Sequence, residues 1–154
     1  MSGEPKPVPR PTPETRPYWE ATRRRELVRH RCDGCGAGTQ HPRAVCACGS
    51  TALTWTPCSG RGRLSSYVVV HRPEPAFADE APFVLAIVEL EEGVRMTTRV
   101  VDVPADPAAL PLGMDLELRW LERGDVNLPV FAPAAPARPA RPARPARPAR
   151  PEGA

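Results

Sequence analysis

Residues 32–49 read CDGCGAGTQHPRAVCACG, and this stretch decides how the first half of the chain is organised. Cys32 and Cys35 form a C-x-x-C-G motif, in which two thiolates can face one ion while the glycine relieves the tight turn that follows. Cys46 and Cys48 form a second pair, which also ends in Cys-Gly. Four cysteines in two such pairs predict a Cys₄ zinc ribbon.

The second pair is C-x-C, one residue shorter than the usual metal-binding knuckle. Three interpretations therefore stay open. The four thiols hold zinc with a distorted second turn, or Cys58, His41 or His30 replaces one ligand, or the ribbon holds no metal. A site with four protein thiolates leaves no open coordination position, so Zn²⁺ bound there would be structural. The segment has few aliphatic residues and needs such a cross-link to stay compact.

Composition separates the two ends of the chain from its middle. The 154 residues include 22 prolines, which gather near both ends, and the formal net charge is +3. Residues 132–154 hold five arginines and one acid, so the remainder of the chain is close to neutral. Both ends lack apolar periodicity. We expect a disordered leader at residues 1–15 and a disordered Ala/Arg/Pro tail at residues 133–154.

The middle of the chain divides at residue 58. Residues 16–57 are expected to form a helix, over 18–27, followed by the ribbon. Residues 58–132 are rich in β-branched and aromatic residues and predict five strands, with a helical turn near 107–110. These strands are expected at residues 63–71, 83–90, 94–103, 115–121 and 128–132. The fold class is therefore mainly β, with a five-stranded OB-fold barrel after the ribbon.

Two of the expected strands carry specific signals. Residues 83–90 (FVLAIVEL) are almost continuously apolar and predict a strand that is buried for much of its length. Glu92 and Gly93 mark a tight turn between this strand and the next, so the two strands should form a hairpin.

The order of these features resembles a family of zinc-ribbon/OB-fold proteins associated with acyl-CoA enzymes. The matching stretches are YWE at 18–20, ELV at 26–28, RCDGCG at 31–36, PR at 42–43, CACGS at 46–50, SGRG at 59–62, APF at 81–83, VELEEGVR at 88–95 and LGM at 112–114. The resemblance covers about residues 16–133, and it rests on the order and spacing of the motifs. The family pattern C-P-x-C is replaced here by Cys46-Ala47-Cys48.

The resemblance implies a role that composition could not show. Members of this family look like accessory subunits of thiolase-fold enzymes, such as thiolases, acyltransferases, ketosynthase-like enzymes and aldolases. In such complexes the ribbon bridges subunits, and the barrel helps to form the channel for the acyl-CoA or acyl thioester. The catalytic cysteine and histidine belong to the partner. The implied function is a non-catalytic subunit of a heteromeric complex.

A few further residues are candidates for contacts with a partner or substrate. Tyr18 and Trp19 could dock a partner or cap the ribbon or barrel, and Arg23 lies in an arginine run that could hold a phosphate or face solvent. His71 and Arg72, at the end of the first barrel strand, could meet substrate in the channel or have no role. No nucleophile motif such as G-x-S-x-G is present, so we expect no catalysis by the chain alone.

Two other functions, nucleic-acid binding and independent thioesterase activity, predict different features of the chain. OB barrels often bind single-stranded nucleic acid, which is the alternative function, but the near-neutral barrel region has few aromatic residues to stack on bases. An independent thioesterase would turn over acyl-CoA without help from another protein.

The arginines of the tail recur every third residue, which in a polyproline II helix aligns them along one edge. They could attract an acidic partner or serve only solubility.

The sequence also bounds the cellular compartment. No stretch approaches the ~20 apolar residues of a membrane span. The five cysteines are an odd number, with four of them at metal-like spacing, which fits a reducing compartment better than a disulfide framework. We expect a cytoplasmic protein without a membrane partner.

Overall fold

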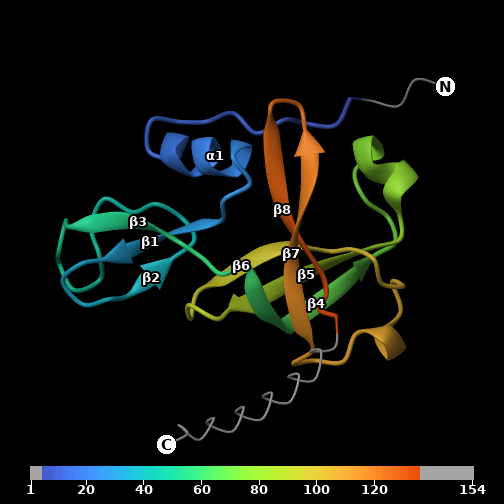
Figure 1. The fold of residues 1–154 in the computed structure, drawn as a ribbon. Coiled ribbons are helices and arrows are strands. Elements are labelled where there is room, and N and C mark those ends of the chain that lie inside the picture. Colours follow the sequence, from blue (N-terminus) through green and yellow to red (C-terminus); the bar gives the residue numbers. More distant parts are fainter. Residues whose placement is uncertain (1–4, 136–154) are drawn as a thin grey trace, which may run out of the picture.

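The computed structural model describes residues 5–135, which form a small ribbon sheet, one helix and a closed β-barrel (Figure 1). The ribbon sheet is antiparallel with the order β2-β1-β3. The helix α1 (Arg16–Arg23) precedes the sheet, whose strands are β1 (Val28–Cys32), β2 (Gly38–Thr39) and β3 (Leu53–Pro57).

Five strands close the barrel in the order β4-β5-β6-β8-β7, which confirms the expected fold class. They are β4 (Arg61–Val70), β5 (Phe83–Leu90), β6 (Arg95–Val100), β7 (Asp115–Arg123) and β8 (Val126–Pro133). Two short 3₁₀ helices, η1 (Pro75–Glu80) and η2 (Pro107–Ala109), lie in the loops. The helical turn expected near residue 107 is η2, whereas η1 was not anticipated.

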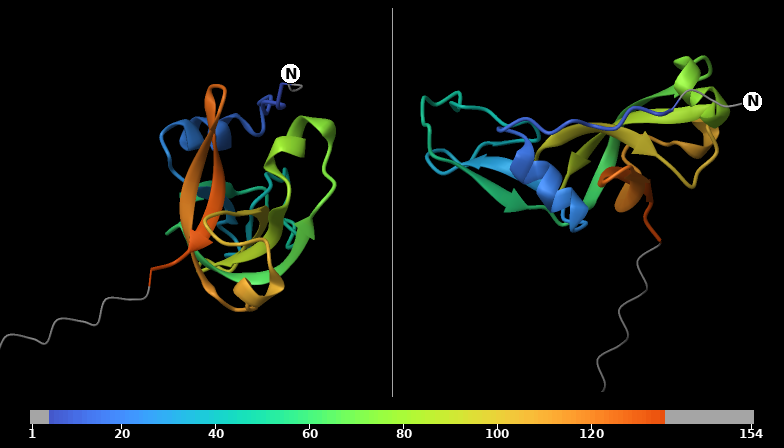
Figure 2. Two further views of the ribbon diagram at one scale, coloured as in Figure 1. Left: turned by 90° about the vertical axis from the view of Figure 1, so that its right-hand side faces the viewer. Right: turned by 90° about the horizontal axis from the view of Figure 1, so that it is seen from above.

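The ribbon sheet lies beside one end of the barrel, and α1 lies against β8 (Figures 1 and 2). The helix is fixed there by the Asn127 side chain, whose amide donates a hydrogen bond to the Thr22 carbonyl at 2.9 Å. Arg23 adds a salt bridge to Asp125 at 2.6 Å. Both contacts join α1 to the hairpin of β7 and β8, which is distant in sequence.

The expected hairpin forms between β5 and β6, with Ala86 opposite Thr98 and Val88 opposite Met96. The Leu90 amide donates to the Val94 carbonyl at 2.8 Å, and Gly93 occupies the turn with φ of +77°. A residue with a side chain is strained at that angle, which is why glycine suits this turn.

Strand β5 corrects one of our expectations. It was predicted to be buried for much of its length, but its residues alternate. Val84 and Val88 point into the core, whereas Leu85 and Ile87 are 37% and 38% exposed. An antiparallel barrel buries only its inner face unless a second layer covers the outside. The outer face of β5 is therefore apolar and exposed in the described structure.

The helix also differs from its prediction over 18–27. It begins earlier, with Pro17 in its first turn, and ends at Arg23. Arg25 follows with φ of +59°, which turns the chain out of the helix and leads Val28 into β1. The strands of the ribbon were not predicted individually because the cysteine and glycine pattern hides their alternation.

The structure describes residues 5–15 of the leader, which was predicted as a disordered segment over residues 1–15. Residues 5–15 follow the barrel, and the Lys6 ammonium forms salt bridges with Asp79, at 2.9 Å, and Glu80 in η1. Apolar periodicity in the sequence cannot predict this contact, because the contact is made by charged side chains. Residues 1–4 and the arginine tail from residue 136 lie outside the described part of the chain.

Between residues 5 and 135, no helix combines the length and the apolar character needed to cross a membrane.

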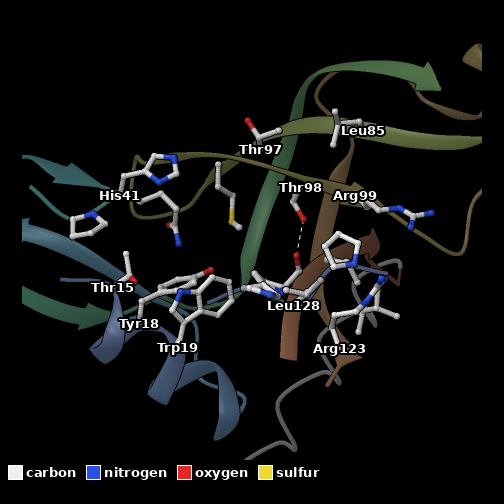
Figure 3. Close-up of a pocket in the computed structure, with 18 of the residues that line it drawn as sticks. Thr15, Tyr18, Trp19, His41, Leu85, Thr97, Thr98, Arg99, Arg123 and Leu128 are labelled. Atoms are coloured by element: carbon white, nitrogen blue, oxygen red, sulfur yellow. Dashed lines mark hydrogen bonds between the residues drawn. The ribbon is translucent and has the colours of Figure 1, made fainter. Parts of the chain in front are cut away.

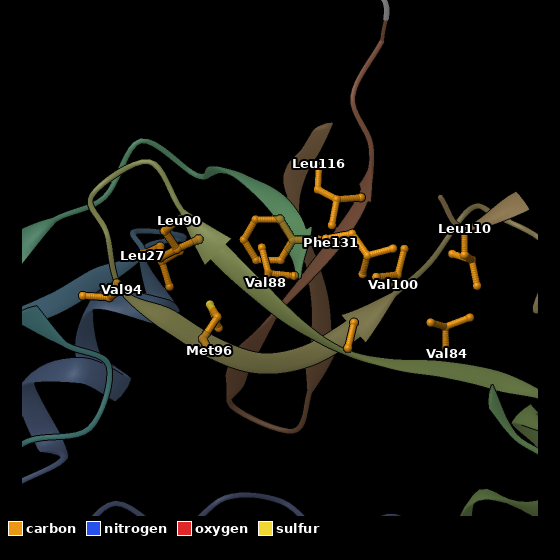
Figure 4. Close-up of a cluster of buried hydrophobic side chains, with 12 residues drawn as sticks. Leu27, Val84, Val88, Leu90, Val94, Met96, Val100, Leu110, Leu116 and Phe131 are labelled. Carbon is orange, nitrogen blue, oxygen red and sulfur yellow. The ribbon is translucent and has the colours of Figure 1, made fainter. Parts of the chain in front are cut away.

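The barrel core gathers around Phe131, which is completely buried (Figure 4). The other buried members of this cluster are Leu27, Leu64, Val84, Ala86, Val88, Leu90, Val94, Met96, Val100, Leu110 and Leu116. Phe131 also pairs with Val100 of β6, and its carbonyl accepts a hydrogen bond from Val101 at 2.7 Å. One residue thus fills the centre of the core and closes the barrel.

We expect Phe131→Ala to lower the free energy of unfolding by about 3–5 kcal/mol, because it leaves a cavity at the centre of the core. Urea denaturation followed by circular dichroism measures this change. Leu112→Ala is the matched control, since Leu112 is 67% exposed and its truncation should change stability by less than about 0.5 kcal/mol. Equal effects of the two substitutions would contradict the assigned core.

Candidate functional site

The four cysteine thiols of the ribbon converge on one point. The Cys32 and Cys48 sulfurs are 3.7 Å apart, those of Cys35 and Cys46 are 3.6 Å apart, and all four lie within 4.8 Å of one another. Zinc–sulfur bonds of about 2.3 Å in a tetrahedron place the sulfurs about 3.8 Å apart. The short second pair therefore does not prevent convergence, and the cluster fits a metal ion.

Tight turns bring each cysteine pair together. In the first, the Gly36 amide donates to the Cys32 carbonyl at 2.8 Å, and in the second the Gly49 amide donates to the Cys46 carbonyl at 2.9 Å. Both glycines have positive φ, at 77° and 87°. Hydrogen bonds from the backbone amides of Cys35 and Gly34 lower the pKa of the Cys32 thiol to about 6, whereas contacts with the neighbouring thiols raise the pKa of Cys35 to about 12, so Cys32 ionises before Cys35.

The structure places the alternative ligands His30, His41 and Cys58 outside the thiol cluster. His30 stacks on Trp55 with ring centroids 4.6 Å apart, and its Nδ1 accepts a hydrogen bond from the Arg43 amide at 3.3 Å. Cys58 packs against the barrel core, where burial raises its pKa to about 12. Among the described residues, the metal-like cluster consists of the four ribbon cysteines.

A second feature is a pocket of about 450 Å³ between the ribbon, α1, the leader and the barrel (Figure 3). Strand β6 forms one wall and β8 the opposite wall, and Thr98 bridges them by donating its hydroxyl to the Pro129 carbonyl at 2.7 Å. The pocket exists because β6 and β8 pair only at Val100 and Phe131. Beyond that pair the strands separate.

The aromatic residues predicted to contact a partner line this pocket. Tyr18 and Trp19 project from α1 and touch edge to face, with centroids 5.1 Å apart. Burial raises the pKa of the Tyr18 hydroxyl to about 12. Both rings therefore belong to the junction between helix, ribbon and barrel.

The remaining sequence candidates lie elsewhere. Arg23 is engaged within the chain, where its guanidinium binds both the carboxylate and the carbonyl of Asp125. His71 and Arg72 follow the end of β4, are exposed and do not line the pocket. The structure thus brings Tyr18 and Trp19 together, and it places His71 and Arg72 at a separate position.

Sequence reasoning missed Arg99 and Arg123, which line the pocket from β6 and β7. Both lie near Glu80, which is in turn paired with Lys6. No sequence signal links residues so far apart, and arginine near a strand end is usually an exposed residue.

Comparisons with known proteins agree with this architecture. A family model described as "ChsH2, C-terminal OB-fold domain" matches residues 55–121. A DUF35 domain-containing scaffold protein of Methanothermobacter thermautotrophicus is 37% identical over 109 residues, which cover 70% of this chain and 80% of that protein. A probable enoyl-CoA hydratase alpha subunit of Thermomonospora curvata is 40% identical over 121 residues. The chain spans only 36% of that subunit.

Two solved structures share the fold. A chain of the structure titled "Ltp2-ChsH2(DUF35) aldolase" superposes with a TM-score of 0.73 at 37% identity, over 83% of this chain and 100% of that one. A DUF35 protein of unknown function from Sulfolobus solfataricus superposes with a TM-score of 0.55 over 79% of this chain and 86% of that one. At 10% identity, the second likeness shows the fold alone.

We expect Cys46→Ser and Cys48→Ser each to lower the bound metal well below one ion per chain, because a thiolate ligand is lost from the cluster. Cys58→Ala is the matched control and should retain the metal, since Cys58 lies outside the cluster. Inductively coupled plasma mass spectrometry of the purified chains measures the content. Metal retained in both serine variants, or lost from the control, would contradict the assigned ligands.

Proposed function

The chain belongs to the DUF35 family, and from this premise we propose that it is a non-catalytic accessory subunit of a thiolase-fold enzyme. The observation that carries the proposal is the likeness to a DUF35 chain of the Ltp2-ChsH2 aldolase, which extends over the whole length of that chain. The name of that aldolase includes a second component, Ltp2. The archaeal relatives are named scaffold proteins, and two bacterial relatives are named alpha subunits of hydratases. These names all describe parts of assemblies.

The outer face of the barrel supports the proposal physically. Val68 of β4 lies directly opposite Leu85 of β5, and Ile87 lies on the same face. Val68 is 56% exposed and the other two are more than a third exposed. Apolar side chains that adjoin one another on a surface are typical of a protein interface. We propose that the partner enzyme covers this face, which we call the β4–β5 face.

The ribbon has a supporting role in the proposed complex. The four thiols would hold Zn²⁺, which lends the ribbon a rigid cross-link that its few aliphatic residues do not supply. Because all four ligands come from the chain, the ion would be structural and would take no part in the reaction. The rigid ribbon then bridges subunits of the complex.

The barrel would help to form the channel for an acyl-CoA or acyl thioester. His71 and Arg72 are exposed on the loop after β4, beside the end of the β4–β5 face. A cationic pair at this position suits an anionic acyl carrier, with Arg72 as the stronger phosphate ligand. The reacting cysteine and histidine would be supplied by the partner.

The alternative, binding of single-stranded nucleic acid, loses support in the structure. It needs exposed aromatic rings on the barrel for base stacking. Among the described barrel aromatics, Tyr67 and Trp120 pack against the core, Phe131 is buried inside it, and the Phe83 ring is covered by the Arg99 guanidinium.

The proposal predicts that the full chain co-purifies with its thiolase-fold enzyme and raises that enzyme's activity or stability. The double substitution Val68→Lys and Ile87→Lys should weaken the association at least about tenfold, because it buries two charges at the interface. Leu112→Lys is the matched control, since Leu112 is apolar and exposed on a loop outside the β4–β5 face. Size-exclusion chromatography with calorimetry measures the binding.

Full activity of the enzyme without this chain, under matched conditions, would refute the proposed role. If the double variant and Leu112→Lys lost equal affinity for the enzyme, the β4–β5 face would not be the docking surface, although the accessory role could still hold.

The channel assignment makes a separate prediction. Arg72→Ala should lower kcat/KM of the assembled enzyme for its acyl-CoA substrate by about tenfold, mainly through KM, while complex formation stays intact. His71→Ala should act in the same direction more weakly. Steady-state kinetics of the reconstituted complex measure both. If the variant that carries both His71→Ala and Arg72→Ala showed unchanged kinetics, these two residues would not line the channel.

A further inference from the structure

The pocket between β6 and β8 has two chemically different ends (Figure 3). Arg99 and Arg123 lie at one end, whereas Tyr18, Trp19 and His41 lie at the other. The walls between them are mainly apolar and include Met96, Leu121, Leu128 and Val130. Such an arrangement suits an elongated molecule with one polar end.

Arg123 is the least satisfied charged group of the pocket. The residue is only 9% exposed, and its Nη1 is fully buried without a hydrogen-bond partner in the described structure. Its Nη2 lies 3.9 Å from the Glu80 carboxylate, which is beyond hydrogen-bond range. A buried guanidinium without an acceptor is costly, so an oxyanion that supplied one would bind favourably.

The charges around Arg123 also favour an anion. Three cations, Lys6, Arg99 and Arg123, surround the single well-shielded carboxylate of Glu80. Hydrogen bonds from Lys6 and Arg99 outweigh the opposing effect of burial and lower the pKa of Glu80, which therefore stays ionised. Asp79 contacts Lys6 but is largely exposed. Positive charge remains in excess at this end of the pocket.

Aromatic rings hold the two guanidinium groups in place. Arg99 lies over the Phe83 ring at 4.2 Å from its centroid, and Arg123 lies 5.7 Å from the centroid of Phe77. Arg99 Nε, like Arg123 Nη1, is buried without a hydrogen-bond partner in the described structure. Stacked arginines are pre-organised, so little side-chain freedom is lost when a ligand binds.

We propose that this pocket binds a small apolar carboxylate, with the carboxylate at Arg99 and Arg123 and the apolar body along Met96, Leu128 and Trp19. A guanidinium matches a carboxylate in shape and charge. The volume of about 450 Å³ is that of a small-molecule site. His71 and Arg72 do not line this pocket, so the cations that would hold the carboxylate differ from those proposed for the acyl carrier.

The leader completes the site. Pro7 and Pro9 line the pocket, and Lys6 anchors this segment to Asp79 and Glu80. The leader would therefore lie beside the arginine end and shield it from water, which strengthens the contact between carboxylate and guanidinium.

Titration of the full chain with octanoate, followed by calorimetry, tests the proposal. We expect saturable binding of one octanoate per chain. Octan-1-ol and octylammonium should bind at least about tenfold more weakly, because neither offers an anionic acceptor to the arginines. Acetate should not bind measurably, since it lacks the apolar body.

Arg123→Gln and Arg99→Gln should each raise the dissociation constant for octanoate about tenfold or more. Arg119→Gln is the matched control, because Arg119 lies on β7 outside the pocket and pairs with Glu117; it should change binding less than about twofold. Leu128→Trp should abolish binding by filling the pocket, whereas Leu112→Trp should not. Circular dichroism confirms that each variant is folded.

Several results would overturn the proposal. These are no saturable binding of octanoate to the wild-type chain, equal affinity for octanoate and octan-1-ol, or equal losses in Arg119→Gln and Arg123→Gln. Should the pocket variants fail to fold, the comparison of octanoate with octan-1-ol and octylammonium on the wild-type chain decides the matter.

Discussion

Strands β6 and β8 pair only at Val100 and Phe131, and this short closure shapes the rest of the molecule. Beyond that pair the two strands of the closed barrel diverge, and the Thr98 hydroxyl donates a hydrogen bond to the Pro129 carbonyl across the space between them. Helix α1, the leader and the ribbon cover the opening. These three elements pack around the space between β6 and β8, and the pocket is the part of this space that their side chains do not fill.

The structure presents three surfaces with different chemistry. The ribbon presents four converging thiols that fit a metal ion. The β4–β5 face presents apolar side chains to solvent. The pocket presents two arginines at one end of an apolar cavity. A scaffold subunit needs a rigid shape and a docking face, and the first two surfaces supply these. The third adjoins the second, because Leu85 lines the pocket and pairs across the sheet with Arg99.

Much of this architecture could be predicted because local patterns encode it. The spacing of the cysteines indicates the ribbon, and Gly93 between two apolar runs indicates the hairpin. The exposure of Leu85 and Ile87 could not be predicted, because an apolar run does not reveal whether a second layer covers it. The Arg99–Arg123 site was hidden for another reason. Its groups meet only after the barrel closes and after Lys6 reaches Glu80 across more than seventy residues of chain.

An electron cryomicroscopy structure of the chain assembled with its thiolase-fold enzyme would test the central claim most directly. The account predicts that the enzyme buries Val68, Leu85 and Ile87, and that the ribbon contacts a second subunit. A complex in which these side chains remain in solvent, or a chain that forms no complex with such an enzyme, would contradict it.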